Sequence, residues 1–112
     1  DFSVLIYPVI SFGTVTHPES VKNLVGENPT SAQKQYFSTQ NYVNAQTPPA
    51  FLVHANNDVS VVPKNSILYS EALTKFKVPT EMHLYQSGGH GFGLGNDWFS
   101  SLKTWMALNK WL

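Results

Sequence analysis

A short apolar run meets a polar turn at residues 50–58, where the sequence reads Ala50-Phe51-Leu52-Val53-His54-Ala55-Asn56-Asn57-Asp58. The apolar part hardly alternates with polar residues, which is typical of a strand buried on both faces in a parallel sheet. The cluster of Asn56, Asn57 and Asp58 is a turn signal directly after that strand. We therefore expect an interior strand over residues 50–55 that brings the Asp58 carboxylate to one rim of a sheet.

Two other stretches have the character of strands. Residues 2–10 (FSVLIYPVI) are almost continuously apolar and rich in β-branched and aromatic residues, so we expect a second strand buried on both faces. Pro8 should mark the point where its pairing ends. Residues 80–85 (TEMHLY) alternate apolar and polar side chains, which predicts a strand with one wetter face near a sheet edge.

Two short helices are expected between the first two strands. Pro18 stands at a first helical turn and Gly26 just past a helix end, which is the usual asymmetry of these residues. Thr30 and Gln33 match a capping box, and the helix that they open is expected to run through about residue 37. The polar residues 39–49 that follow are expected to be a connection.

Two longer helices are expected in the second half of the chain. Apolar residues at helical spacing predict a helix over residues 64–76. Asn96 is expected to cap a last helix, with Asp97 in its first turn. The apolar stripe of this last helix comprises Trp98, Leu102, Trp105, Met106 and Leu112. Its helical spacing favours a core stripe over an aromatic platform for a sugar.

The order of these elements predicts an α/β protein with three parallel strands and flanking helices. In open sheets of this kind, sites form beyond the carboxyl ends of the strands. The third strand is followed by Gln86-Ser87-Gly88-Gly89-His90-Gly91-Phe92-Gly93-Leu94-Gly95, in which half of the residues are glycine. Asp58 and His90 are therefore expected on the same rim, within hydrogen-bonding reach of each other.

A carboxylate beside a histidine is the pairing of acid and general base in a catalytic triad. The order acid then histidine is that of α/β-hydrolases, in which a serine precedes both, yet no G-x-S-x-G occurs in this sequence. Other readings stay open at this point. His90 can be an incidental histidine in a mobile turn, and Asp58 can be only a turn residue. Asp97 is a rival acid, although aspartate in a first helical turn complements the helix dipole.

The remaining histidines indicate structural roles. His54 lies within an apolar strand and is expected to be a core residue with its hydrogen bonds satisfied, and His17 is expected to be a cap or loop residue. His83 is expected to be a solvated or partnered strand residue. The four histidines have no spacing typical of zinc ligands, so neither a metal nor another cofactor is expected.

Composition limits the class of protein. With 112 residues the chain is one domain or part of one. Seven basic residues balance seven acidic ones, and only 12% of residues are charged, so neither nucleic acid nor a membrane is an expected partner. There is no cysteine, and no apolar run approaches the length of a membrane span.

Several of these motifs together resemble one family. They are His54-Ala55-Asn56-Asn57-Asp58, Val61-Val62-Pro63 with Asn65-Ser66, Pro79 to Tyr85, Gly88-Gly89-His90-Gly91-Phe92-Gly93 and the final tryptophan-bearing helix, with Val4 to Ile10 and Asn23 to Pro29 upstream. They are similar to the C-terminal half of α/β-hydrolase carbohydrate esterases, the bacterial acetyl xylan esterase and feruloyl esterase-like group. One departure is a residue more than usual between the acid and the Val-Pro pair, which predicts a reshaped acid loop.

The resemblance implies a fold and an activity. Residues 1–112 would be the C-terminal part of a single α/β-hydrolase domain, with Asp58 as triad acid and His90 as triad base. The substrate would be an acylated carbohydrate, such as an acetyl or feruloyl ester of xylan. The N-terminal half with the nucleophilic serine would be supplied by the same or a separate polypeptide, and the protein would be periplasmic or secreted.

Two other functions remain open from the sequence. The chain can be a non-catalytic fragment or an interaction half, or it can belong to a peptidase or dienelactone-type hydrolase that uses the same triad. Because residues 2–10 read as an interior strand without an outer neighbour, the isolated chain is expected to associate through this edge and to be inactive alone.

Overall fold

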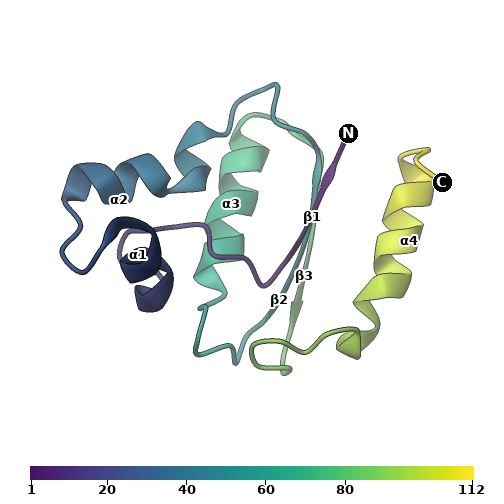
Figure 1. The fold of residues 1–112 in the computed structure, drawn as a ribbon. Coiled ribbons are helices and arrows are strands. Elements are labelled where there is room, and N and C mark those ends of the chain that lie inside the picture. Colours follow the sequence, from purple (N-terminus) through teal and green to yellow (C-terminus); the bar gives the residue numbers. More distant parts are fainter.

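The computed structural model describes residues 1–112 and is organised around a parallel sheet of three strands, in the order β1-β2-β3 (Figure 1). The strands are β1 (Ser3–Ile6), β2 (Ala50–Ala55) and β3 (Thr80–Tyr85). Every residue of β2 is buried, because this strand is paired on both sides and covered on both faces. The predicted α/β class and the interior position of residues 50–55 are confirmed.

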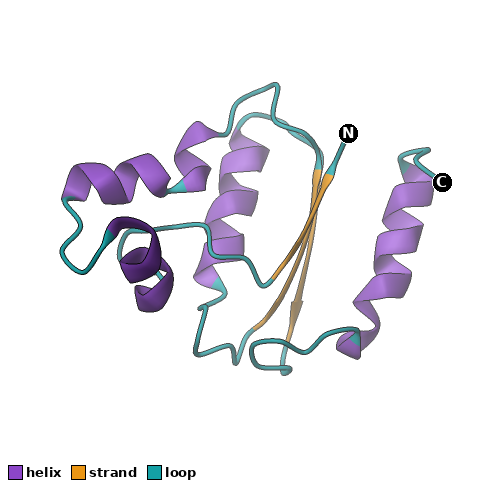
Figure 2. Ribbon diagram, in the orientation of Figure 1, coloured by secondary structure: helices purple, strands orange, loops and turns teal.

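Two helices cover opposite faces of the sheet (Figure 2). Alternate side chains of β2 pack on α3 (Lys64–Lys75) and on α4 (Trp98–Leu108), which divides the apolar core into two clusters. The α3 cluster contains Val43, Ala50, Leu52, Leu73 and Val78. The α4 cluster contains Phe51, Val53, Trp98, Leu102 and Trp105. The tryptophan stripe of the last helix is therefore core, as expected.

The two short helices lie on the α3 side of the sheet (Figure 1). In α1 (Pro18–Val25), His17 is the N-cap residue and Gly26 the C-cap residue, so His17 is a cap as expected. In α2 (Ser31–Phe37), the Thr30 capping box is formed in both directions. The connection that follows contains one 3₁₀ turn, Thr39–Tyr42. None of the helices has the length and the apolar composition that a membrane span needs.

The first strand is shorter and more exposed than its sequence predicts. Only Ser3–Ile6 is strand, and all four residues are half-buried. Tyr7 still donates its N–H to the Val53 carbonyl at 2.7 Å, but its positive φ of 41° turns the chain away. Pairing thus ends one residue before Pro8. The predicted burial on both faces is only partial: Leu5 packs on the α3 cluster, and Val4 and Ile6 pack on the α4 cluster, but the edge of β1 away from β2 is open.

Two details of the second half also differ from expectation. Leu84 is among the exposed large apolar residues, while the His83 ring packs against Phe51. The alternation of apolar and polar residues in β3 therefore does not correspond to one buried and one solvent-exposed face. Asn96 does not cap α4; it has a φ of 62° in a 3₁₀ turn before the helix. Leu112 lies beyond the end of α4 and is 74% exposed, so it is not part of the stripe.

Asn65 joins the segment after β1 to the start of α3. Its Oδ1 accepts hydrogen bonds from the backbone N–H groups of Ile10 and Ser11, at 3.0 and 2.9 Å. Its Nδ2 donates to the carbonyls of Val15 and Val62, at 2.8 and 3.0 Å. Asn65 is fully buried, so this one side chain satisfies four backbone groups and fixes the path of the segment.

We expect Asn65→Ala to lower the free energy of unfolding by about 3 kcal/mol, because it leaves several buried backbone groups without partners. Urea unfolding followed by circular dichroism measures this change. Asn28→Ala is the matched control, since Asn28 is exposed and should be neutral. A loss below about 1 kcal/mol for Asn65→Ala would show that the segment is held by other contacts.

Candidate active site

The loops after β2 and β3 meet at one rim of the sheet. Parallel strands end at the same edge, so residues 56–58 and 86–95 begin side by side. The Asn57 side chain connects the two loops directly, since its Oδ1 accepts the backbone N–H of Gly89 at 2.8 Å. This bond places the residue before His90 against the residue before Asp58.

Asp58 and His90 are bonded to each other, as predicted. The Nδ1 atom of His90 lies 2.8 Å from Oδ2 of Asp58. Asp58 is buried, with 2% of its surface exposed, whereas 38% of the His90 side chain is exposed. The ring therefore has one nitrogen held by a buried carboxylate, and its Nε2 makes no hydrogen bond within the chain. An imidazole held in this way can transfer a proton at Nε2.

The Asp58 carboxylate also shapes its own turn. Its Oδ1 accepts hydrogen bonds from the backbone N–H groups of Ser60 and Val61, at 3.0 and 2.9 Å, while Oδ2 faces His90. The two roles considered from the sequence, turn residue and partner of the histidine, are thus filled by different oxygens of one side chain.

The pKa of Asp58 lies below its ordinary value of 3.8. Burial by itself raises this pKa, but it is outweighed by the hydrogen bonds with His90, Val61 and Ser60 and by the charge of His90. The carboxylate therefore stays ionised at neutral pH, where it can stabilise a protonated imidazole.

This lowered pKa predicts how stability changes with pH. The unfolded chain takes up a proton near pH 3.8, before the folded chain does, so the ionised carboxylate contributes its full stabilisation above that pH. The contribution should be lost as the pH falls through the lower folded pKa. We expect the stability difference between the native protein and Asp58→Asn to shrink below pH 3.8. Urea unfolding at a series of pH values measures it, and a constant difference would contradict the assignment.

One aromatic ring, that of Tyr7, contacts the exposed imidazole, and a second ring packs against Tyr7. The centroid of the Tyr7 ring lies 4.8 Å from that of His90 and 5.1 Å from that of Phe92, both in edge-on geometry. Tyr7 reaches this place through its positive φ, a conformation that non-glycine residues seldom adopt and that is often found at functional sites. The sequence carries no signal for this contact.

Gly88 lets the loop close tightly. A Cβ atom at this position would lie 2.9 Å from side-chain atoms of both Phe92 and Asn96, so only glycine fits without movement. Asn96 in turn donates to the carbonyl of Ser87 at 2.9 Å. The glycine-rich loop is therefore a defined structure that carries His90.

The other candidates from the sequence lie elsewhere. Asp97 accepts a hydrogen bond from the Ser100 hydroxyl at 2.7 Å and is not the partner of His90. His83 is paired with Glu81 at 2.7 Å, and His54 is fully buried and hydrogen-bonded at both nitrogens, as expected for both. No group of three histidine, aspartate or glutamate side chains is arranged to hold a metal ion.

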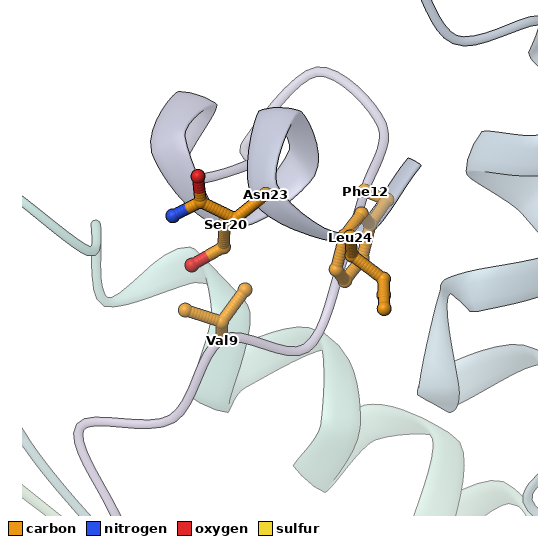
Figure 3. Close-up of a pocket in the computed structure, with 5 residues that line it drawn as sticks. All are labelled: Val9, Phe12, Ser20, Asn23 and Leu24. Atoms are coloured by element: carbon orange, nitrogen blue, oxygen red, sulfur yellow. The ribbon is translucent and has the colours of Figure 1, made fainter. Parts of the chain in front are cut away.

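The larger of the two hollows in the structure, about 440 Å³, lies between α1 and the segment after β1 (Figure 3). Its lining consists of Val9, Phe12, Ser20, Asn23 and Leu24. Neither Asp58 nor His90 belongs to this lining, so the hollow is distinct from the place where the acid and the histidine meet.

Comparison with known proteins finds relatives that match most of this chain. The chain is 40% identical over 101 residues to endo-1,4-beta-xylanase B of Butyrivibrio fibrisolvens, a match of 90% of this chain and 16% of that protein. It is 40% identical over 104 residues to acetylxylan esterase of Xylanibacter ruminicola, covering 88% and 22%. A solved acetyl ester-xyloside bifunctional hydrolase of Caldicellulosiruptor lactoaceticus is 39% identical with a TM-score of 0.95, covering 100% and 43%.

The chain thus spans less than half the length of each of these relatives. Its fold is part of an α/β-hydrolase fold, and the resemblance to carbohydrate esterases is confirmed. Residues 8–110 match the family described as "Prolyl oligopeptidase family", and this range includes both the acid loop and the histidine loop. The chain belongs to the prolyl oligopeptidase family of α/β-hydrolases.

Proposed function

We propose that this chain supplies the acid and the base of a serine-type carboxylic ester hydrolase that acts on acylated carbohydrate. Asp58 is the acid and His90 the base. The observation that supports this proposal is the hydrogen bond of 2.8 Å between a buried carboxylate and a half-exposed imidazole at the carboxyl ends of two adjacent parallel strands. Acetyl and feruloyl esters of xylan-type substrates are the expected class, since relatives include an acetylxylan esterase and an acetyl ester-xyloside hydrolase.

The reaction would use His90 as a proton carrier. Its Nε2 takes the proton of a serine hydroxyl while that oxygen bonds to the ester carbonyl carbon. The imidazolium then gives the proton to the oxygen of the leaving alcohol as the ester C–O bond breaks. Water repeats the sequence on the acyl-enzyme and releases the acid. Asp58 holds Nδ1–H throughout and stabilises the charged ring, so that Nε2 faces the reacting oxygen.

The serine would come from a segment outside residues 1–112, in the same or a separate polypeptide. No G-x-S-x-G occurs in this chain. β1 pairs only with β2, so its other edge can accept the strands of such a segment. Phe2, Val4 and Ile6 beside that edge are partly buried apolar residues that further strands would cover. We propose that residues 1–112 form the C-terminal part of a single hydrolase domain, and that the chain is inactive without the serine-bearing part.

A peptidase is the second candidate, because the matching family takes its name from prolyl oligopeptidase. The same acid and base would serve amide hydrolysis, so their geometry does not separate the two reactions. A dienelactone-type hydrolase would use them in the same way. Substrate preference decides among these candidates.

The experiment is to express the complete protein and compare kcat/KM for acetylated xylan fragments, feruloyl esters, a dienelactone and proline-containing peptides. We expect the acylated carbohydrates to be preferred. An active-site serine probe should label the protein, and residues 1–112 alone should neither be labelled nor hydrolyse esters. Preference for peptides would support the second candidate. Absence of labelling and of all turnover in the complete protein would favour the non-catalytic alternative and overturn the proposal.

A further inference from the structure

The buried histidine His54 lies next to the Asp58 carboxylate. It is in β2 on the face that packs against α3, four residues before Asp58, and it is completely buried. Its Nε2 lies 2.7 Å from the carbonyl oxygen of Val61 and 3.2 Å from Oδ2 of Asp58. Oδ2 is the oxygen that also faces His90 Nδ1, so two imidazole rings meet the same carboxylate oxygen.

The partners of His54 identify its tautomer. The Val61 carbonyl can only accept a hydrogen bond, so Nε2 of His54 carries a proton. At Nδ1, the partner is the Ser66 hydroxyl at 2.7 Å, from the first turn of α3. In the neutral ring Nδ1 accepts from that hydroxyl, which fixes the proton on Nε2. The positive end of this N–H dipole then lies beside the Asp58 carboxylate.

Val61 connects His54 to Asp58 a second time. Its N–H donates to Oδ1 of Asp58 at 2.9 Å, and its carbonyl accepts from His54. The backbone N–H and the carbonyl of Val61 thus both help to hold the loop that contains Asp58, the first through Asp58 and the second through His54. Ser66 extends this support to α3, because its hydroxyl orients the His54 ring.

We propose that Ser66 and His54 form a positioning pair that fixes the Asp58 carboxylate for His90. The pair acts through Asp58 and touches no reacting atom. The proposal rests on the proposed function for its effect on turnover, since the kinetic consequence follows only if Asp58 and His90 are the acid and the base. Its structural part, control of the bond between Asp58 and His90 by His54, can be measured without any substrate.

The test compares variants at both positions in the complete protein. His54→Phe keeps a ring and removes the N–H that faces Val61 and Asp58, whereas His54→Gln keeps an N–H donor near the place of Nε2. We expect His54→Phe to lower kcat about 10- to 100-fold with little change in KM, because small misplacement of a catalytic group has effects of this size. His54→Gln should restore part of the loss. Ser66→Ala, the milder change, should lower kcat less than His54→Phe.

A spectroscopic signal separates positioning from a general loss of structure. The low-field proton resonance of the His90 Nδ1–H, which bonds to Asp58, should shift or broaden in His54→Phe and Ser66→Ala. His83→Phe is the control, since His83 bonds to Glu81 and has no contact with Asp58; it should leave both kcat and the resonance unchanged.

The outcomes distinguish the two proposals. If the native protein hydrolyses no ester but the resonance responds to His54→Phe, the proposed function fails and the positioning pair stands. If the resonance and kcat of His54→Phe and Ser66→Ala stay within about twofold of the native protein, the positioning pair is wrong whatever the substrate. Should His54→Phe not fold, Ser66→Ala alone decides in the same way.

Discussion

His90→Ala is expected to lower kcat for ester hydrolysis by about four to six orders of magnitude in the complete protein. In the proposed function, the variant removes the group that takes the serine proton and returns it to the leaving alcohol. Binding of substrate does not need the imidazole, so KM should change little. Steady-state kinetics on an acetylated sugar ester measures the effect, and the serine probe should react far more slowly for the same reason.

The matched control for this variant is His83→Ala. His83 lies in β3, the strand that leads into the His90 loop, and pairs with Glu81 at 2.7 Å. It should retain native turnover. Unchanged turnover in His90→Ala would end the assignment of the base, and an equal loss in both variants would indicate damage to β3 rather than to catalysis.

The layout of the sheet could be predicted because local and global signals agree. Residues 50–55 are apolar in sequence and fully buried in the centre of the sheet. The capping box at Thr30 and the helix limits at Pro18 and Gly26 depend only on neighbouring residues, and the structure has all of them. Parallel order then places the two loop residues Asp58 and His90 on one rim without further information.

The errors in the fold arise where a residue's conformation depends on distant parts of the chain. Tyr7 takes a positive φ and its ring reaches His90, so β1 ends earlier than its apolar run suggests. Asparagine is a residue type that often caps helices, but the Asn96 side chain donates to the Ser87 carbonyl instead. Propensity describes the local preference, and these tertiary contacts override it.

The contacts that support the site are not predictable from the sequence, for the same reason. Asn57 accepts the N–H of Gly89 across 32 positions of sequence, and Asn65 binds Ile10 across 55. No local pattern encodes such pairs. The sequence predicts that His54 is a core histidine with its hydrogen bonds satisfied, and this is confirmed. That its Nε2 lies 3.2 Å from Oδ2 of Asp58 depends on the turn in which the Asp58 N–H donates to the Ala55 carbonyl.

The second large effect is expected for Asp58→Asn, which should lower kcat by about three to four orders of magnitude while the fold is retained. The amide oxygen can still accept the N–H groups of Ser60 and Val61, so the turn keeps its shape. The amide nitrogen then replaces Oδ2 and donates toward Nδ1 of His90. This donation holds the His90 proton on Nε2, the nitrogen that accepts the serine proton in the proposed function.

The same replacement places a second donor beside the Nε2–H of His54, which lies 3.2 Å from Oδ2 in the native site. The orientation of the amide that preserves the turn thus sets two donors side by side at His54 and also gives His90 the wrong tautomer, and a higher substrate concentration cannot correct that tautomer. Kinetics together with circular dichroism measures the effect, and Asp97→Asn is the control, because Asp97 bonds only to Ser100. A folded Asp58→Asn protein with kcat within about tenfold of native would show that His90 works without its acid.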